Sequence, residues 1–532
     1  MAAVNESYDK TGDVDDIELS TMDAGRRQES VTRYSYEEAL DMTGHGKYNL
    51  GLLVACFVVI TAMGIDIFGL GIIVTAATCD LGIGLHEIGV LSSMPFAGII
   101  VMSYPWGYLS DTKGRKLVLM WAMCGAFFSS LFSSFAPNWQ MLAAFRFISS
   151  AFSSAAESAT YALLGECCTT RVRARYMLLM TSALMLTPTI YYVWGYMIMK
   201  LDFSITFLSI VYRPWRLLTQ IMALPLGLGA LMLHFFSESP KFLANVGRSD
   251  ECVDVLKRIY VKNGGAGNDF PVKEIYLEDG STEEVGEFSL RSLWIQIAPL
   301  FKPPLLSKTL LLYYLTFVIY IANNSFAIIL PTIFNVFFTS YATSAADASF
   351  CDLFALSNTT TTVNIVDNID GDGDSQVEAK VCTDTINNFT ILAGCVHGLS
   401  FFVLNALLSQ CANKRKVMTI VIMVIAAAAA VGLNNWNQPI AGLVLFYVYL
   451  TTAMVFGVVS SYFVDLFPTS YRGMVACVGM MVARLSAFFG TNIVSRAMTN
   501  HCDMTMYGAA GLVISGAIAA SLLPADTELL SN

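Results

Sequence analysis

The ten residues that decide the fold read GYLSDTKGRK and run from Gly107 to Lys116. They lie between two apolar stretches, 88–108 and 117–135, each long enough to cross a bilayer as a helix. The glycines permit a tight turn and close helix approach, and Asp111 can cap a neighbouring helix or pair with a base. Three cations would hold the segment at the cytoplasmic surface. The stretch therefore predicts a short cytoplasmic loop between two transmembrane helices.

The composition of the whole chain predicts lipid as its solvent. Of the 532 residues, 55% are hydrophobic and 14% charged, and the mean hydropathy is +0.58. A soluble domain needs more polar surface than this. Because the bilayer core offers no water to backbone polar groups, spanning segments must be helices or a closed barrel, and the long apolar runs favour helices. The net charge of −10 lies mainly in tails and large loops, so we expect no nucleic-acid partner.

Apolar stretches of spanning length occur in two groups of six, which predicts an all-α polytopic membrane protein with twelve transmembrane helices in two bundles. The stretches lie at 50–77, 88–108, 117–135, 139–163, 176–200, 217–236, 309–335, 387–410, 417–433, 439–464, 474–497 and 505–523. The predicted organisation is a cytoplasmic tail at 1–48, a six-helix bundle at 49–236, a cytoplasmic linker at 237–308, a second bundle at 309–524 and a cytoplasmic tail at 525–532. The linker carries the signal of a short helix, with Ser249 as its N-cap.

The distribution of Lys and Arg predicts that both termini are cytoplasmic. Short loops rich in these residues resist translocation, and they fall on the side expected to be inside. The first 48 residues are polar and show no secretory signal, which agrees. The exceptions on the opposite side are Lys200, Arg213, Arg216 and Lys380.

The polar insertion at 337–386 is expected on the outer face. It contains the glycosylation sequon Asn358-Thr359-Thr360, and Cys351 and Cys382 flank its polar middle. These two cysteines either form a disulfide or remain unpaired, and both alternatives are open.

The 107–116 segment resembles the loop signature of the major facilitator superfamily. The segment 465–473 (DLFPTSYRG) echoes Glu166 to Arg171 in the first half, as expected of a duplicated half. Within the superfamily the chain resembles the synaptic vesicle glycoprotein 2 and organic-ion or sugar-porter-like branch, through 36–49 (YEEALDMTGHGKYN) and 64–68 (GIDIF). The resemblance implies a cytoplasmic gate that charge pairs stabilise. Its expected members are Gly107, Asp111, Gly114, Arg115, Arg146, Glu166, Arg171, Asp465 and Arg472.

Three ionisable residues fall inside predicted membrane helices, where each needs a partner, water or a function. Asp66 is either a substrate or proton site or half of a structural ion pair. Glu157 lies among small residues and either forms a hydrogen bond across helices or exchanges protons. Arg484 is either a structural partner or an anion ligand. Arg146 lies 11 residues before Glu157, about 16 Å along a helix, so these two cannot pair.

Polar and aromatic side chains in two other helices are further candidates for a solute pocket. Asn323 and Asn324 place amides in the seventh helix, and Trp194 lies in the fifth. For Trp194, core packing or a position in the interfacial belt is the competing interpretation.

These features predict a secondary active transporter of a small polar organic solute, of the organic-ion or sugar class, working by alternating access with protons as the candidate coupling ion. The alternative is a non-transporting receptor or vesicle-trafficking scaffold, which an eroded second loop signature around 410–414 favours. No enzyme activity, cofactor or metal is expected. We expect a monomer in the plasma membrane or an intracellular vesicle membrane.

Overall fold

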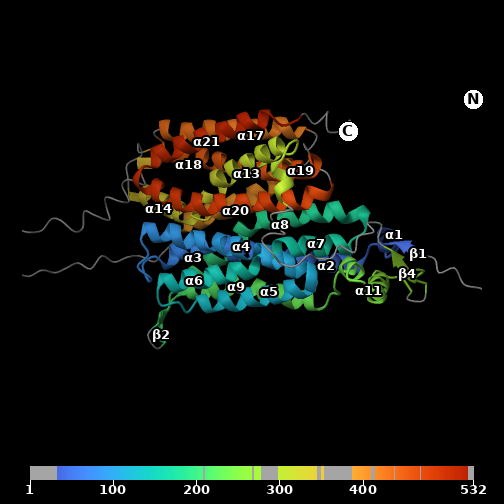
Figure 1. The fold of residues 1–532 in the computed structure, drawn as a ribbon. Helices are drawn as coiled ribbons and strands as arrows, with labels where there is room; N and C mark the ends of the chain where they lie inside the picture. Colours follow the sequence, from blue (N-terminus) through green and yellow to red (C-terminus); the bar gives the residue numbers. More distant parts are fainter. Residues whose placement is uncertain are drawn as a thin grey trace, which may run out of the picture.

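The computed structural model describes residues 33–207, 210–266, 269–276, 297–343, 349–352, 386–408, 414–436, 438–467 and 469–524. These residues form two helical bundles that lie against each other, with the first half of the chain in one and the second half in the other (Figure 1). The fold is the predicted one.

The first bundle contains six membrane segments, two of them broken. Its helices are α2 (Lys47–Phe68) with α3 (Leu70–Ala77), α4 (Leu85–Lys113), α5 (Arg115–Ser133), α6 (Trp139–Ser153) with α7 (Ala155–Cys167), α8 (Thr170–Met199) and α9 (Pro214–His234). A short hairpin, β2 (Ile205–Phe207) and β3 (Ile210–Tyr212), joins α8 to α9. We call the end of the bundles that carries this strand pair the hairpin end.

The second bundle repeats this plan. Its helices are α13 (Leu306–Ala327) with α14 (Leu330–Thr343), α16 (Asn388–Leu408), α17 (Arg415–Asn435), α18 (Pro439–Leu450) with α19 (Ala453–Asp465), α20 (Thr469–Asn500) and α21 (Cys502–Ser521). The halves meet where α4 packs on α20, α8 on α16 and α3 on α14. These contacts make α4, α8, α16 and α20 the central helices of the molecule.

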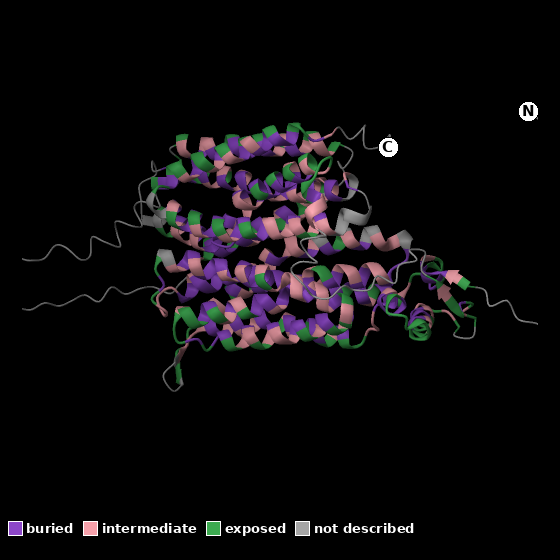
Figure 2. Cartoon of the chain, viewed as in Figure 1, coloured by how far each residue is buried: buried purple, intermediate pink, exposed green. Residues whose placement is uncertain are grey.

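Ten of the twelve segments in the described residues are long and apolar enough to cross a membrane. The other two are α6 with α7, whose parts are 15 and 13 residues long, and α8, which has several side chains outside the described residues. The outward faces are apolar, as lipid contact requires: Leu224, Leu228 and Leu231 form an exposed stripe at helical spacing on α9. Figure 2 shows the buried residues concentrated inside the bundles.

The linker and the start of the described chain form a small unit at the opposite end, which we call the α11 end. It contains β1 (Arg33–Ser35), α1 (Tyr36–Met42), α10 (Pro240–Asn245), α11 (Ser249–Lys262), β4 (Glu274–Tyr276) and the 3-10 turn η1 (Ala298–Phe301). Strand β1 pairs in parallel with β4. Residues 33–48 are thus structured and packed, unlike a free tail. The helix α11 begins at Ser249, so its N-cap is Arg248 and the predicted N-cap was one residue late.

Neither alternative left open for Cys351 is correct, because Cys351 is bonded to Cys502 at the start of α21, with their Cα atoms 5.5 Å apart. Cys382 lies outside the described residues, as does the sequon at Asn358. A partner 151 positions away could not be identified from the spacing within one loop. The bond ties the segment after α14 to the last helix of the same bundle.

Candidate functional site

A buried ion pair lies inside the first bundle. Arg146 Nη1 on α6 donates to Asp66 Oδ1 on α2 at 3.1 Å, and both side chains are at most 1% exposed. Ser149 Oγ donates to Asp66 Oδ2 at 2.8 Å, and Arg146 Nη1 also donates to Ser130 Oγ on α5 at 3.2 Å. Three helices of one half therefore meet at a neutralised pair of charges.

This pair corrects the position expected for Arg146. We grouped Arg146 with the cytoplasmic gate, but its guanidinium contacts Asp66 and Ser130 in the bundle interior. For Asp66 the geometry matches the ion-pair interpretation, since its carboxylate receives bonds from Arg146 and Ser149. The cost of burying either charge is reduced by the other.

A second ion pair crosses between the halves. Arg484 Nη2 on α20 pairs with the Glu157 carboxylate on α7, and Arg484 Nη1 donates to Ser103 Oγ on α4 at 2.7 Å. The Arg484 side chain is 11% exposed and the Glu157 side chain 31%. A cation of the second bundle is thus held by two side chains of the first. Sequence reasoning identified Arg484 and Glu157 separately but did not pair them.

The remaining pocket candidates have local partners. Asn323 Nδ2 donates to Asn324 Oδ1 at 2.8 Å, so these half-buried amides satisfy each other in part. Trp194 is partly buried and packs against the hydrophobic core, which matches the packing interpretation. Neither observation identifies a bound solute.

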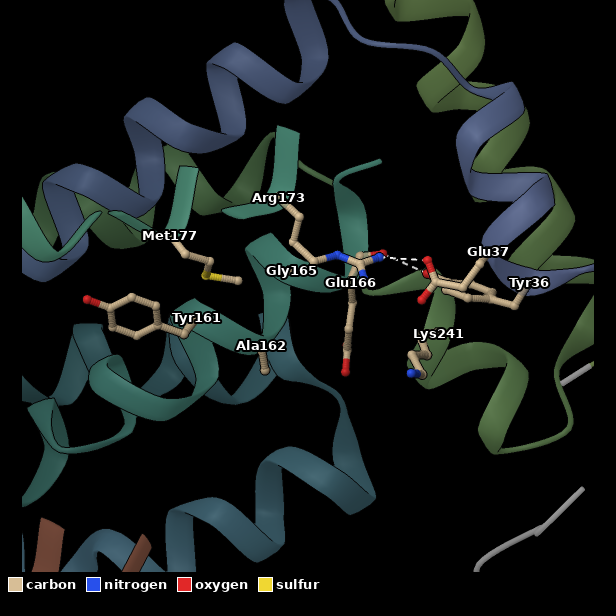
Figure 3. A pocket seen from close by; sticks show the side chains of 9 residues that line it. All are labelled: Tyr36, Glu37, Tyr161, Ala162, Gly165, Glu166, Arg173, Met177 and Lys241. Atoms are coloured by element: carbon tan, nitrogen blue, oxygen red, sulfur yellow. Dashed lines mark hydrogen bonds and ion pairs between the residues drawn. The ribbon is translucent and has the colours of Figure 1, made fainter. Parts of the chain in front are cut away.

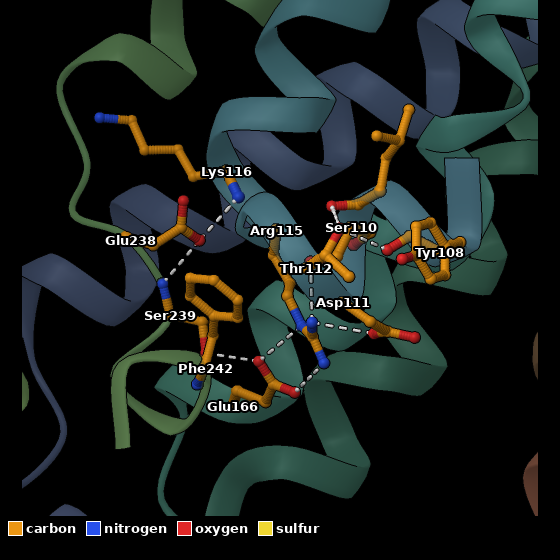
Figure 4. A network of polar contacts seen from close by, with 11 residues as sticks. Tyr108, Ser110, Asp111, Thr112, Arg115, Lys116, Glu166, Glu238, Ser239 and Phe242 are labelled. Carbon is orange, nitrogen blue, oxygen red and sulfur yellow. Dashed lines mark hydrogen bonds and ion pairs between the residues drawn. The ribbon is translucent and has the colours of Figure 1, made fainter. Parts of the chain in front are cut away.

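A network of charges holds the α11 end of the first bundle together (Figure 4). Arg115 Nη1 pairs with Asp111 at 2.8 Å, and Arg115 Nε lies 3.4 Å from Glu166 on α7. Glu166 also accepts a hydrogen bond from Ser239 Oγ in the linker. The predicted gate residues Asp111, Arg115 and Glu166 therefore come together, and the linker joins them.

Two glycines of the same signature have different roles. Gly114 has a φ of +110°, a conformation that disfavours residues with a Cβ, and a Cβ there would lie 2.6 Å from the Glu238 carboxylate. Nothing lies within 4 Å of a Cβ built on Gly107, so close helix approach does not explain that residue. The side chains of Arg171, Asp465 and Arg472 are outside the described residues.

Sequence reasoning missed the role of Glu238 at this end. Its carboxylate accepts from the backbone N–H groups of Lys116 at 2.8 Å and Leu117 at 3.2 Å. These are free donors in the first turn of α5, where a negative charge is favourable. In the sequence, an acidic residue just before the Ser-Pro start of α10 is only a weak signal of this contact, because the N–H groups that it accepts from are more than a hundred residues away.

The amino-terminal segment covers a pocket of about 250 Å³ at the α11 end (Figure 3). Tyr36 Oη donates to the backbone O of Glu166 at 2.6 Å, and Arg173 Nη2 pairs with Glu37 at 2.7 Å. Burial raises the pKa of Tyr36 well above its usual range, so its hydroxyl stays a donor. Lys241 completes the lining together with Tyr161, Ala162, Gly165 and Met177.

At the hairpin end, Asp80 explains two exceptions to the expected charge asymmetry. Its carboxylate lies 3.4 Å from Arg213 Nε and 3.3 Å from Arg216 Nη2. Trp215 Nε1 also donates to it at 3.0 Å. The two cations are therefore partly neutralised by a carboxylate of the connection between α3 and α4.

Further contacts between the halves lie toward the hairpin end. Thr75 and Thr332 hydroxyls lie 2.8 Å apart, one from each half. A Cβ built on Gly71 would lie 2.0 Å from the backbone O of Ile328. Thr189 Oγ1 on α8 donates to the Cys395 backbone O on α16 at 3.5 Å. These contacts join the bundles at this end.

The chain forms two six-helix bundles with an ion pair across their interface. This arrangement defines it as a polytopic membrane protein with the two-half architecture of transporters. A sequence model of the Major Facilitator Superfamily matches residues 54–365, more than half of the chain. The chain belongs to the Major Facilitator Superfamily, a family of transporters and not of enzymes.

Similarity to individual proteins is consistent with membership of this family. The chain is 25% identical over 248 residues to synaptic vesicle glycoprotein 2C of Mus musculus, covering 45% of this chain and 33% of that protein. It is 25% identical over 229 residues to organic cation/carnitine transporter 7 of Arabidopsis thaliana, covering 43% of each. The match therefore spans about a third to under half of these relatives' lengths.

The fold also matches a solved structure. The partially occluded inward open conformation of the xylose transporter XylE from E. coli has a TM-score of 0.62 at 14% identity. The match covers 90% of this chain and 98% of that one. At this identity the likeness shows the fold.

Proposed function

We propose that the protein is a secondary active transporter of a small polar organic solute, working by alternating access between its two bundles. Protons are the proposed coupling ion. Family membership supports transport, and the printed descriptions of similar proteins include an organic cation/carnitine transporter and a D-xylose-proton symporter.

The observation that carries the proposal is the polar link between Arg484 on one half and Glu157 and Ser103 on the other. Alternating access moves the halves relative to each other about a midplane site. Arg484 lies near the middle of α20, so a link through it to the other half must change as the halves move. Its charges are therefore in a position to couple solute or proton binding to the motion.

The test is uptake of labelled sugars, organic cations and carboxylates into proteoliposomes, with and without an imposed pH gradient. We expect saturable uptake of one class, stimulated by the gradient, and a loss of coupling in Glu157→Gln. Empty liposomes and liposomes with heat-denatured protein are the controls. If folded protein moves none of these solutes, transport is refuted and the receptor or scaffold alternative takes its place.

We further propose that both termini are cytoplasmic, that the loop after α14 is on the opposite side, and that the protein is a monomer in the plasma membrane or a vesicle membrane. Helix α14 extends to Thr343, so this loop begins later than the predicted residue 337. Glycan attachment at Asn358 tests the orientation. A mass shift on glycosidase treatment that disappears in Asn358→Gln would support it. If neither protein shows a shift, and protease cleaves the loop as soon as the plasma membrane alone is permeabilised but not in intact cells, the loop is cytoplasmic and the proposed orientation is refuted.

A further inference from the structure

The two partners of the Arg484–Glu157 ion pair differ in whether they can lose their charge, and this difference limits which solutes the pair can bind. Arg484 bonds through both terminal nitrogens to the first bundle, one to Glu157 and one to Ser103. An arginine does not lose its proton in a protein, whereas a carboxylate can be neutralised by one proton. When the halves separate, only the glutamate can therefore shed its charge.

A lone guanidinium in the bundle interface is costly. Removing one partner of a buried ion pair leaves the other charge uncompensated, which is strongly unfavourable. The Arg484 side chain is only 11% exposed, so water compensates little of this cost. A state in which Arg484 leaves Glu157 thus requires another anion on the guanidinium.

We propose that Arg484 is the binding site for the carboxylate of an organic acid, and that one proton on Glu157 accompanies each carboxylate. This inference rests on the proposed transport function and specifies its substrate class. The substrate carboxylate replaces the Glu157 carboxylate on Arg484, and the proton neutralises the displaced glutamate. One negative and one positive charge enter together, so the loaded site keeps the net charge of the empty one.

A cationic or neutral solute fits this site less well. A cation would pair with Glu157 but leave Arg484 without a counterion, and its own charge would repel the guanidinium. A sugar hydroxyl supplies a hydrogen bond but no charge. A planar carboxylate matches the fork of the guanidinium and accepts two parallel N–H bonds. Ser103 Oγ would remain as a second acceptor beside it.

Three other ion pairs on the elements around α7 lie within the first half. The helix packs against α2, α4, α5, α6, α8 and α10, while Arg484 reaches it from α20. Asp66 of α2 is paired with Arg146 of α6, Asp111 of α4 with Arg115 of α5, and Arg173 of α8 with Glu37. Among the side chains that the structure describes on these elements, the further titratable groups are Lys47, Tyr48, Cys56, Glu87, Tyr104, Tyr108, Lys113, Lys116, Cys124, Tyr161, Glu166, Cys167, Tyr176, Tyr191, Tyr192, Tyr196, Lys241, Cys477 and Arg496.

Binding to the purified full-length protein tests the inference without requiring flux. The probes are acetate, lactate, benzoate and succinate, with tetraethylammonium as the cation, measured calorimetrically at pH 5.5 and 7.5. For the wild type we expect carboxylate affinity to rise up to about tenfold per pH unit as the pH falls, because one proton is taken up. Glu157→Gln removes the internal competitor and should bind carboxylate at least about tenfold more tightly than the wild type at pH 7.5, independently of pH.

A double variant, Glu157→Gln with Arg484→Gln, leaves no unpaired charge and so guards against loss of the fold. It should bind no carboxylate while retaining its thermal unfolding profile. The inference is overturned if this double variant binds carboxylates as well as Glu157→Gln does. It is also overturned if Glu157→Gln binds none of the four acids, or if tetraethylammonium binds the wild type and is lost in Glu157→Gln.

The two proposals fail separately. Uptake of a sugar or a cation by a protein that binds no carboxylate would keep the transport function and reject its assignment to organic acids. Proton-dependent carboxylate binding without any uptake would reject transport while retaining Arg484 as a carboxylate site.

Discussion

Replacing Asp66 with Asn tests the ion pair inside the first bundle. The change keeps the size of the side chain and removes its charge. Arg146, which is 1% exposed, then loses its counterion, and the bond from Ser149 no longer has a charged acceptor. The Nε and Nη2 atoms of Arg146 have no hydrogen-bond partner among the described residues, so the remaining charge is poorly compensated.

The expected cost follows from this burial. Breaking a buried ion pair by removing one partner destabilises a protein by about 3–5 kcal/mol. For a cooperative unit of 150–250 residues, the size of one bundle, each kcal/mol lowers Tm by about 2–4 °C. Asp66→Asn should therefore lower Tm by about 6–20 °C.

Thermal unfolding of the purified protein in detergent measures the effect. Ser149→Ala is the milder control, since it removes one hydrogen bond to a charged group, worth about 1.5–3 kcal/mol. The apolar double variant Asp66→Leu with Arg146→Met should be more stable than Asp66→Asn, because it leaves no buried charge. An unchanged Tm in Asp66→Asn, or a double variant less stable than the single one, would refute the reasoning.

Three further predictions concern other parts of the molecule. Non-reduced peptide mapping should recover a Cys351–Cys502 cross-linked peptide, and its absence would contradict the observed pairing. Gly71→Ala should loosen the hairpin end, because the added Cβ would lie 2.0 Å from a carbonyl oxygen. Hydrogen exchange in α3 and α14 should then become faster, whereas the control Gly508→Ala, which has open space around the added Cβ, should leave it unchanged. Burial raises the pKa of Cys252 to about 12, so little thiolate forms at pH 7.5. Maleimide should therefore label Cys252 only after denaturation, and fast labelling of Cys252 in the folded protein would contradict this.

The sequence predicted the helices well because their signal is local. Spanning length and apolarity can be counted along the chain, and the twelve predicted stretches coincide with the helices of the two bundles. The breaks at Gly69, Ser154, Ile328–Ile329 and Thr451–Thr452 were not predicted. Each falls inside an apolar run, where hydropathy does not distinguish a continuous helix from a broken one.

The sequence predicted individual residues of the candidate site but not which of them pair with each other. Asp66, Glu157 and Arg484 stood out because a charge inside an apolar stretch is costly. Helix spacing correctly separated Arg146 from Glu157, yet it cannot show which side chain of another helix lies opposite. The same limit applies to Cys351, whose partner belongs to a different segment of the chain.

The pairing of β1 with β4 also constrains the order in which parts of the protein can fold during synthesis. Arg33 aligns with Glu274, 241 positions later in the chain. At about 5–20 residues per second, a ribosome needs roughly 12–48 s to make the intervening segment. During that interval the first strand has no partner, although the six helices that follow it are entering the membrane. Strand β1 is therefore synthesised before the six membrane segments of the first half, yet it is among the last parts of that half to reach its final position.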